Sequence, residues 1–536
     1  MLSFLSIDKL STTDLIGECM MPRLDVETFI SNEAYREATI KLVREHKTGG
    51  FCVFAEFPES VVEAVTTLQN EAMQAREATA FEGIPLLFSC DCEFGLRMRL
   101  KHGGTEFPDA MAMAKSANPE LVRQVGEAIA REMRTLGLDW NFAPVADVNS
   151  NPKNPIINTR SFGDDPETVI QFAVPFMQGL QSAGVAGCAK HFPGHGDTAV
   201  DSHHELPFIE EGSRRFDSVE LPPFEALVRA GVGSVMTGHL ACPDFARELG
   251  GSDEQSVLPA TLSRTLTTIL LRERLGFTGV IVTDAMEMHA ITKLFGDGEA
   301  AVRALEAGAD VLLMPVEPEG AFVALVAAVE KARISREEVE EKVKRIWEMR
   351  VAAFGHRTHQ SDLTNPSEEN ALQSLAALEE AHLPLSQTIA RNAIRLTGKI
   401  NLLGAKLIII ADDRPQATGK AEYFAKAAAR MFEEINTIMV SQWQSSAVEI
   451  SDDTVIATFH RARGYLGGTA TDWTLPRIMA AIGGSRPGMA APRGLILIGS
   501  PYLGQDFERA PGFVLKTFSE SIPSIDAALE RLNHAE

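Results

Sequence analysis

The stretch GVIVTD at residues 279–284 shows the strand pattern that recurs through most of the chain. It is a short apolar run rich in β-branched residues, typical of a buried strand, and it ends at a carboxylate, Asp284. Runs of this kind recur through the first 350 residues, with longer helical patterns between them, and this alternation favours a parallel sheet. The eight runs are IGECMMP (16–22), GGFCVFA (49–55), IPLLFSC (84–90), LDWNFAPV (138–145), GVAGCAK (184–190), GVGSVMTG (231–238), GVIVT (279–283) and ADVLLMP (309–315).

The segments between the runs have the spacing of amphipathic helices. Residues 118–137, NPELVRQVGEAIAREMRTLG, repeat apolar side chains at intervals near 3.6 residues. Eight strands with helices between them predict an α/β fold of the (β/α)8 TIM-barrel type over residues 1–355. An open doubly wound sheet remains an alternative, because a strand count does not prove closure.

A second, smaller unit follows. Residues 334–355 form a helical pattern with a capping-box signal at Ser335 and Glu338, and residues 356–399 are expected to be a polar linker followed by a connecting helix at 383–397. Residues 400–536 then predict a parallel-sheet α/β domain of the αβα sandwich type. Its expected strands are KLIIIA (406–411), NTIMVS (436–441), DTVIATF (453–459) and GLILIG (494–499).

Composition excludes several classes of protein. The chain has 536 residues with 50 Lys+Arg against 73 Asp+Glu, a formal charge of −23 that disfavours a nucleic-acid binder. No apolar run reaches the length that crosses a membrane, and the first residues lack the pattern of a signal peptide. The six cysteines do not resemble a disulfide framework and are expected to be buried thiols. We therefore expect a cytoplasmic protein without nucleic-acid or membrane partners, as a monomer or homodimer.

Ionisable side chains gather where the predicted strands end, which in a barrel is the catalytic face. The densest cluster is KHFPGHGDTAVDSHHELP at 190–207, where proline and glycine prevent a regular helix. This segment has three interpretations: a solvated loop, a metal site, or a loop that catalyses the reaction or binds the substrate. The spacing of its histidines and aspartates fits no standard zinc pattern. Within it Asp201 lies two residues from His203, so the carboxylate can orient the imidazole for proton transfer. Asp284 could be a nucleophile, a general base or a metal ligand.

Several motifs together resemble glycoside hydrolase family 3, and its NagZ-type β-N-acetylglucosaminidases in particular. KHFPGHGDT at 190–198 is followed by D-S-H at 201–203, and VTDAMEM stands at 282–288. The segments FSCDCEFGLRMRL (88–100), LDWNFAPVADVNSNPKNP (138–155), INTRSFGDDPE (157–167) and LILIGSPYLGQDF (495–507) also resemble segments of this family, so the resemblance covers essentially the whole chain.

The resemblance implies a role for each matching residue. Asp284 would be the catalytic nucleophile, His203 the general acid/base and Asp201 its partner. The residues that would grip the sugar at the cleavage point are Asp91, Arg99, Arg160, Lys190 and His191, while His195, His204, His239 and Met288 would lie behind them. Phe94 and Leu96 depart from the family pattern, because they replace a glycine and an arginine in the loop that holds Arg99.

These roles imply a retaining exo-β-N-acetylglucosaminidase that removes terminal GlcNAc through a glycosyl ester on Asp284. The resemblance suggests a GlcNAc-anhydroMurNAc muropeptide from peptidoglycan recycling as the substrate. No organic cofactor is expected, because the sequence has neither a G-x-x-x-x-G-K-[ST] motif nor a convincing G-x-G-x-x-G motif, and no metal is expected. A histidine acid/base gains no negative charge when it loses its proton, so phosphate could attack instead of water and a phosphorylase stays open. Substrate-assisted catalysis through the N-acetyl group and a non-catalytic sugar-binding protein are the further alternatives.

Overall fold

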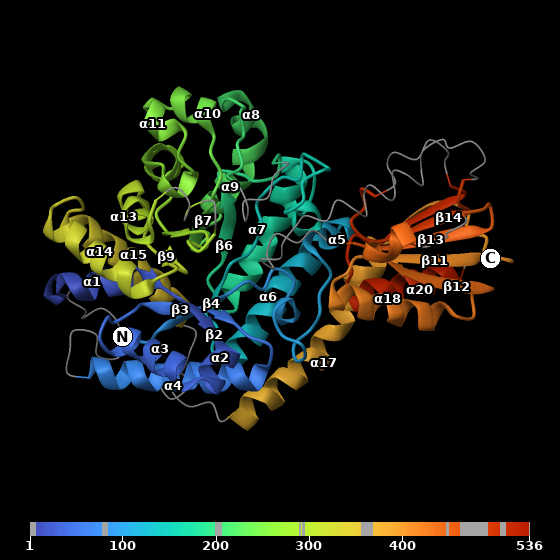
Figure 1. The fold of residues 1–536 in the computed structure, drawn as a ribbon, viewed down its shortest axis with the longest axis horizontal. Helices are drawn as coiled ribbons and strands as arrows, with labels where there is room; N and C mark the ends of the chain where they lie inside the picture. Colours follow the sequence, from blue (N-terminus) through green and yellow to red (C-terminus); the bar gives the residue numbers. More distant parts are fainter. Residues whose placement is uncertain are drawn as a thin grey trace.

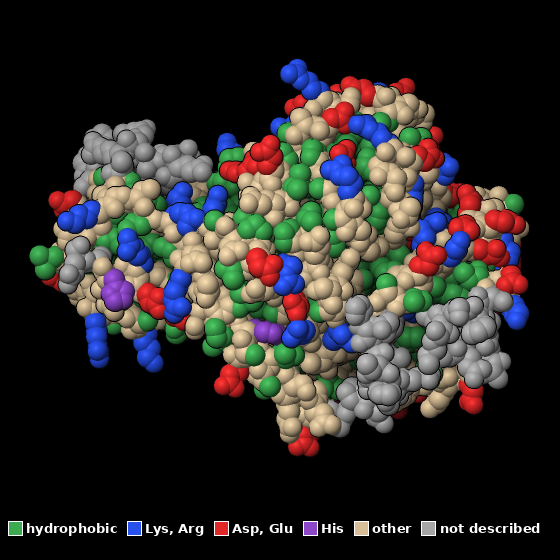
Figure 2. Space-filling view, turned by 180° about the vertical axis from the view of Figure 1, so that it is seen from behind, with side chains coloured by type: hydrophobic (Ala, Val, Ile, Leu, Met, Phe, Trp, Pro, Cys, Tyr) green, Lys and Arg blue, Asp and Glu red, His purple; other side chains and the backbone are tan. Residues whose placement is uncertain are grey.

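The computed structural model describes residues 7–77, 84–198, 206–288, 291, 295–354, 368–445, 450–460, 491–503 and 511–534. In this part of the chain, residues up to 354 form one helix-covered assembly of parallel strands, and a separate six-stranded sheet lies at the C-terminal end (Figure 1). None of the helices described combines the length and the apolar composition that a membrane crossing requires. Acidic and basic side chains are interspersed over the face drawn in Figure 2.

The strands of the first assembly are short and buried. They are β1 (Met20–Met21), β2 (Arg23–Asp25), β3 (Gly50–Phe54), β4 (Leu87–Cys90), β5 (Trp140–Asn141), β6 (Cys188–Phe192), β7 (Ser234–Thr237), β8 (Val280–Thr283) and β9 (Leu312–Leu313). Each of the eight apolar runs expected from the sequence contains or overlaps one of these strands. Residues 16–18 of the first run are an exception, because they belong to helix α1 (Thr12–Glu18), which Ser11 caps in a reciprocal capping box with Asp14.

The parallel pairings of these strands form a continuous chain that returns to its start. Strands β2, β3, β4 and β5 pair in order, and so do β6, β7 and β8. Bridges between Trp140 and Ala186 and between Val282 and Val311 connect these groups to each other and to β9. Strand β9 pairs with β1, which only Pro22 separates from β2. The parallel α/β architecture predicted from the sequence is confirmed, and the carboxyl ends of all these strands face the same side.

Helices follow the strands in alternation. Those of the first assembly are α2 (Val26–Ser31), α3 (Glu33–Arg44), α4 (Pro58–Arg76), α5 (Ala110–Lys115), α6 (Pro119–Thr135), α7 (Pro166–Ser182), α8 (Ser213–Arg215), α9 (Leu221–Arg229), α10 (Pro243–Glu248), α11 (Asp253–Ser256), α13 (Asp297–Ala307), α14 (Pro318–Glu330) and α15 (Arg336–Phe354). Shorter turns are η1 (Ile7–Lys9), η2 (Leu96–Met98), η3 (Asn158–Arg160), η5 (Ala260–Leu262) and the π-helical η4 (Phe216–Glu220) and η6 (Thr265–Arg274).

The sequence explains where several helices begin. Asn118 and Asp165 accept hydrogen bonds from the first turns of α6 and α7, and a proline follows each as the first helical residue. The capping box predicted at Ser335 is present, because Ser335 Oγ accepts from Glu338 N while Glu338 accepts from Ser335 N. All six cysteines are buried and free, as expected.

A buried ion cluster closes the end of the first assembly where the strands begin. Glu18 accepts from Arg76 at 3.2 Å and from Arg350 at 2.7 Å, and Trp347 donates to the same carboxylate. All three charged side chains are fully buried. The cluster connects α1, α4 and α15, so it joins the first helix of this assembly to its last.

The C-terminal sheet has the strand order β10-β15-β14-β13-β11-β12. Its strands are β10 (Arg395–Gly398), β11 (Lys406–Ala411), β12 (Glu434–Met439), β13 (Thr454–His460), β14 (Gly494–Gly499) and β15 (Phe513–Lys516), and its helices are α18 (Pro415–Ala428), α20 (Ile522–Asn533) and the 3-10 turn η7 (Val440–Ser445). The four predicted strands are present, but the sheet is not entirely parallel, since the edge strand β10 runs antiparallel to β15.

The connecting helix differs from its expected range. Helix α17 spans Glu368–Ala393, so it begins inside the segment expected to be a linker and continues through Pro384. Residues 395–398, expected at the end of that helix, form β10 instead. The helix packs against α4, α5 and α6, and this tertiary packing extends it beyond the region where the sequence pattern is strongest.

Candidate active site

Four of the predicted site residues lie at the carboxyl ends of neighbouring strands. Asp91 follows β4 directly, Lys190 and His191 lie in the last part of β6, and Asp284 follows β8. Arg99 follows the turn η2, and Arg160 ends the turn η3 in the segment after β5. Because parallel strands end at one edge, side chains distant in sequence meet here.

Asp91 is the first centre of this cluster. Lys190 Nζ lies 2.6 Å from Asp91 Oδ1, and Arg99 donates to the other carboxylate oxygen. The Arg99 guanidinium also lies over the ring of Phe54, 4.5 Å from its centroid, in cation–π contact. The departures from the family pattern at Phe94 and Leu96 therefore leave Arg99 in contact with Asp91.

Glu93 is the second centre, and the sequence analysis did not single it out. Arg160 donates to it in a bidentate arrangement, with Nη2 2.7 Å from Oε1 and Nε 3.0 Å from Oε2. Lys190 Nζ lies 2.8 Å from the same Oε1. Lys190 thus bridges Asp91 and Glu93, and five charged side chains from two loops and strand β6 form one network.

Charge pairing controls the protonation of this network. Burial would raise the pKa of Glu93, but Arg160 and Lys190 reverse this effect and hold it well below the usual range. Burial opposes the charge of Lys190 in the same way, yet Asp91 and Glu93 raise its pKa above that of a free lysine. The network is therefore fully ionised at neutral pH, although Lys190 and Arg160 are only 2% and 4% exposed.

His191 is held by Asp147, another residue whose role the sequence did not assign. His191 Nδ1 lies 2.7 Å from Asp147 Oδ2, and the Asp147 carboxylate also accepts from the backbone N–H groups of His191 and His195. Because an ionised carboxylate can only accept, this contact assigns a ring hydrogen of His191 to Nδ1. His195 lies deeper, where burial lowers its pKa to about 4, so its ring is neutral at neutral pH.

The glycine-rich segment after β6 packs closely on the loop that follows β5, at Val148. A Cβ atom on Gly196 would lie 1.6 Å from the carbonyl oxygen of Val148, so only glycine permits this approach. Asn154 donates to the carbonyl oxygens of His195 and Gly196, which fixes the backbone here. Asp201, His203 and His204 lie outside the described residues, which end at Thr198 and resume at Leu206.

Asp284 is half-buried at the tip of β8. Its backbone N–H donates to Thr237 O at 3.0 Å, and its Oδ1 accepts from Ala285 N at 2.8 Å. His239, which follows β7, reaches Ala285 O with Nε2 at 2.9 Å and Thr261 Oγ1 with Nδ1 at 2.8 Å. The backbone that carries Asp284 is thus fixed from two neighbouring segments.

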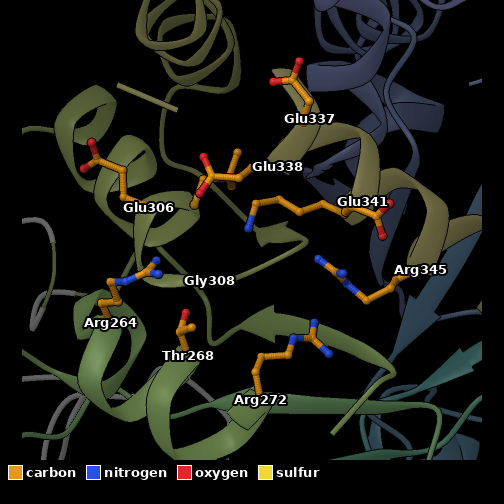
Figure 3. Close-up of a pocket in the computed structure, with 11 residues that line it drawn as sticks. Arg264, Thr268, Arg272, Glu306, Gly308, Glu337, Glu338, Glu341 and Arg345 are labelled. Atoms are coloured by element: carbon orange, nitrogen blue, oxygen red, sulfur yellow. The ribbon is translucent and has the colours of Figure 1, made fainter. Parts of the chain in front are cut away.

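A charged cavity of about 380 Å³ lies between η6, α13 and α15, at the opposite end of the strands from these residues (Figure 3). Its Arg272 and Arg345 both pair with the fully buried Asp310, and Lys342 donates to Ala309 O. These partners compensate the cations and connect α15 to the start of β9. The interactions are those of a structural support.

The comparisons with known proteins agree with the motifs. Residues 12–349 match the family described as glycosyl hydrolase family 3 N terminal domain. Beta-hexosaminidase A of Pseudoalteromonas piscicida is 32% identical over 365 residues, which cover 63% of this chain and 60% of that protein. The chain thus spans about 60% of the length of this curated relative.

Solved structures extend the likeness to the whole chain. A glycoside hydrolase family 3 beta-N-acetylglucosaminidase from Paenibacillus sp. str. FPU-7 superposes with a TM-score of 0.78 at 29% identity, covering 98% of this chain and 96% of that one. Beta-glucoside phosphorylase BglX superposes with a TM-score of 0.80, covering 99% of this chain and 92% of that one. At 20% sequence identity, this likeness shows a shared fold alone. By the match over residues 12–349, which takes in every site residue described above, the chain belongs to glycosyl hydrolase family 3.

Proposed function

We propose that this protein is a retaining exo-β-N-acetylglucosaminidase that hydrolyses terminal β-linked GlcNAc. The observation that carries the proposal is the ionic network of Asp91, Glu93, Arg99, Arg160 and Lys190 beside His191, at the strand ends where Asp284 also lies. Three of its members, Glu93, Arg160 and Lys190, are buried. Such a network offers fixed donors and acceptors to the hydroxyl groups of one sugar ring. The beta-N-acetylglucosaminidase and beta-hexosaminidase names of its relatives favour GlcNAc as that sugar.

In the proposed mechanism Asp284 attacks the anomeric carbon and forms a glycosyl ester, while His203 protonates the departing oxygen. His203 then removes a proton from water, which attacks the ester and releases the sugar with its original configuration. Asp201 holds the His203 ring and favours its protonated form. Asp91, Arg99, Arg160, Lys190 and His191 bind the sugar hydroxyl groups, and no metal or organic cofactor takes part.

We propose further that residues 1–355 are a (β/α)8 TIM-type barrel, 356–399 a linker and helix, and 400–536 an αβα sandwich domain. The ring of parallel pairings supports the barrel. We place the enzyme in the cytoplasm, acting on small GlcNAc-containing peptidoglycan fragments as a monomer or homodimer. Phosphorolysis is the second candidate, because a histidine acid/base would not repel an incoming phosphate.

The test is an NMR product assay with an aryl β-GlcNAc, with and without phosphate. We expect β-GlcNAc as the first product in both buffers, whereas GlcNAc 1-phosphate would identify a phosphorylase. Asp284→Asn should abolish turnover without changing the fold, and Asp253→Asn, at a fully exposed aspartate, is the matched control. Substantial turnover by Asp284→Asn would refute the nucleophile, and no turnover by the wild type would refute the activity.

The histidine is tested separately. His203→Ala should slow substrates with poor leaving groups much more than activated aryl glycosides, because only the former need a proton on the departing oxygen. Equal losses on both kinds of substrate would contradict its role as the acid.

A further inference from the structure

The two loops that meet at the Glu93–Arg160 ion pair both contact the C-terminal part of the chain. Residues 91–109 follow β4 and carry Glu93, and residues 147–163 follow β5 and carry Arg160. We propose that Glu106 and Tyr502 are positioning residues, through which the C-terminal part holds these two loops in register. The proposal rests on the proposed function for its kinetic consequences, but not for its structural ones.

Glu106 is inserted among three elements of the C-terminal part. Its Oε1 lies 2.7 Å from Lys420 Nζ on α18, and its Oε2 accepts from Ile522 N, the first residue of α20, at 3.1 Å. Its carbonyl oxygen accepts from Ser386 Oγ on α17 at 2.6 Å. A carboxylate at a helix N-terminus with a lysine beside it is a favourable arrangement.

The protonation of Glu106 agrees with an ion pair. Burial would raise its pKa, but Lys420 and the Ile522 N–H group lower it below the value of a free glutamate. The contact therefore stays charged at the pH at which a cytoplasmic enzyme works.

A short backbone path leads from Glu106 to Glu93. The next residue, Phe107, is fully buried and donates its N–H to Phe94 O at 3.2 Å. Gly95 packs so closely on the segment before Glu106 that a Cβ atom there would lie 2.8 Å from Thr105 O. Because Phe94 is adjacent to Glu93, a shift of Glu106 moves the backbone that carries the Glu93 carboxylate.

Tyr502 acts on the other loop. Its hydroxyl oxygen accepts from Asn149 Nδ2 at 3.0 Å, and Asn149 Oδ1 accepts in turn from Asn158 N at 2.8 Å. Arg160 is two residues further along the same turn, η3. Burial raises the pKa of Tyr502 to about 12, so the hydroxyl is neutral at working pH.

The contacts of Glu106 and of Tyr502 with the two loops therefore both lead to the Glu93–Arg160 pair. Both side chains are buried, and their paired atoms are 2.7 and 3.0 Å apart, so a small displacement of either loop breaks the bidentate geometry. Lys190 shares Oε1 of Glu93 and would move with it. Positioning errors near 1 Å at a reacting centre can reduce rates by up to about 10²-fold.

The structural test is hydrogen exchange on the full-length protein, followed by mass spectrometry. Glu106→Gln should increase exchange in peptides from 91–109, and Tyr502→Phe should increase it in peptides from 147–163, including the Asn158 amide. The control is Arg391→Gln, which removes an exposed ion pair between α17 and α20 and should leave both loops unchanged. Unchanged exchange in both loops of the two variants would overturn the proposal.

The kinetic test uses an aryl β-GlcNAc. Each variant should lower kcat/KM by about tenfold, mainly through KM if sugar binding is disturbed. The double variant should lose less than the product of the two single losses, because both act on one ion pair. Lys420→Met should reproduce Glu106→Gln and Lys420→Arg should retain most of the activity.

The outcomes separate the two proposals. If the wild type turns over no GlcNAc glycoside, the proposed function fails while hydrogen exchange still decides the positioning role. If Glu106→Gln does not fold, Tyr502→Phe alone carries the test, since it removes only one oxygen atom. Losses in kcat/KM no greater than that of Arg391→Gln, or losses that multiply in the double variant, would contradict the proposal.

Discussion

Arg160 donates two hydrogen bonds to Glu93, one from Nη2 at 2.7 Å and one from Nε at 3.0 Å, at a depth where both side chains are nearly inaccessible. Because two donors contact two oxygens, the pair fixes the orientation of the guanidinium as well as its distance. Lys190 shares one oxygen of this carboxylate and also contacts Asp91. Glu93 is thereby the residue on which the geometry of both cations depends.

Glu93→Gln keeps the shape of this side chain and removes its charge. Arg160 and Lys190 then lose part of their compensation in a buried site, which costs about 3–5 kcal/mol where one partner of a buried pair is removed. We expect kcat/KM to fall by roughly 10²-fold and the melting temperature to decrease, measured by steady-state kinetics and calorimetry. Glu330→Gln, at an exposed site at the end of α14, is the control. Wild-type kinetics in Glu93→Gln would contradict this role.

Asp147→Asn should release His191. The asparagine side chain cannot accept hydrogen bonds at both of its terminal atoms, so the Nδ1 hydrogen of His191 loses its fixed acceptor. We expect a lower kcat and a mixture of ring tautomers, which ¹⁵N NMR of the imidazole reports directly. A single Nδ1–H tautomer in the variant would show that another group orients the ring.

Glu220 makes the stability of the fold depend on pH. Its carboxyl group lies against Gly194, with Arg215 as its ion-pair partner and with Asp147, Asp197 and Cys242 nearby. Burial raises its pKa from 4.5 to about 7, and Asp147 and Asp197 contribute to the increase while Arg215 opposes it. Since the folded state holds this proton more tightly than the unfolded state, stability decreases as pH rises from about 4.5 to about 7.

Glu220→Gln removes this titration. The melting temperature of the variant, relative to the wild type, should therefore be higher at pH 8 than at pH 5, by an amount corresponding to at most about 3 kcal/mol. Thermal melts at the two pH values measure the difference, with Glu225→Gln on α9 as the control. Parallel pH profiles for wild type and variant would contradict the assignment.

Glu18→Gln tests the opposite end of the first assembly. It leaves Arg76 and Arg350 without a carboxylate where all three side chains are fully buried, so we expect a loss of about 3–5 kcal/mol in the free energy of unfolding. The KM should not change, because the cluster lies at the strand ends remote from Asp284. Denaturant unfolding and kinetics on the same preparation separate the two effects, and an altered KM would disprove this independence.

The core of the fold could be predicted from the sequence because buried parallel strands appear as short apolar runs. The run at 279–283 is almost identical to β8, and the run at 406–411 is identical to β11. Residues 395–398 escaped prediction because β10 is an edge strand whose side chains are largely exposed, so it lacks an apolar pattern. Residues 16–18 were misassigned because the Ser11–Asp14 capping signal lay outside the apolar run.

The site was predicted less completely. The motifs singled out Asp91, Arg99 and Lys190, and the structure places Arg99 and Lys190 on the two oxygens of the Asp91 carboxylate. Their role as sugar-binding residues remains a prediction. Glu93 stands in one of those motifs and Asp147 at a strand end, but spacing alone does not reveal which cation a carboxylate faces. The roles assigned to Asp284, His203 and Asp201 remain predictions. For Asp201 and His203 no geometry is described.

The burial of the Glu93 network has a consequence for ionic strength. Mobile ions screen charges that water surrounds, with a Debye length of about 8 Å at physiological salt, but they have little access to Lys190 and Arg160 at 2% and 4% exposure. Most charged side chains that the structure describes are exposed or half-buried, where salt can reach them, whereas the five of this network are largely shielded from solvent. Binding of a neutral sugar at this network should therefore change little between dilute buffer and concentrated salt.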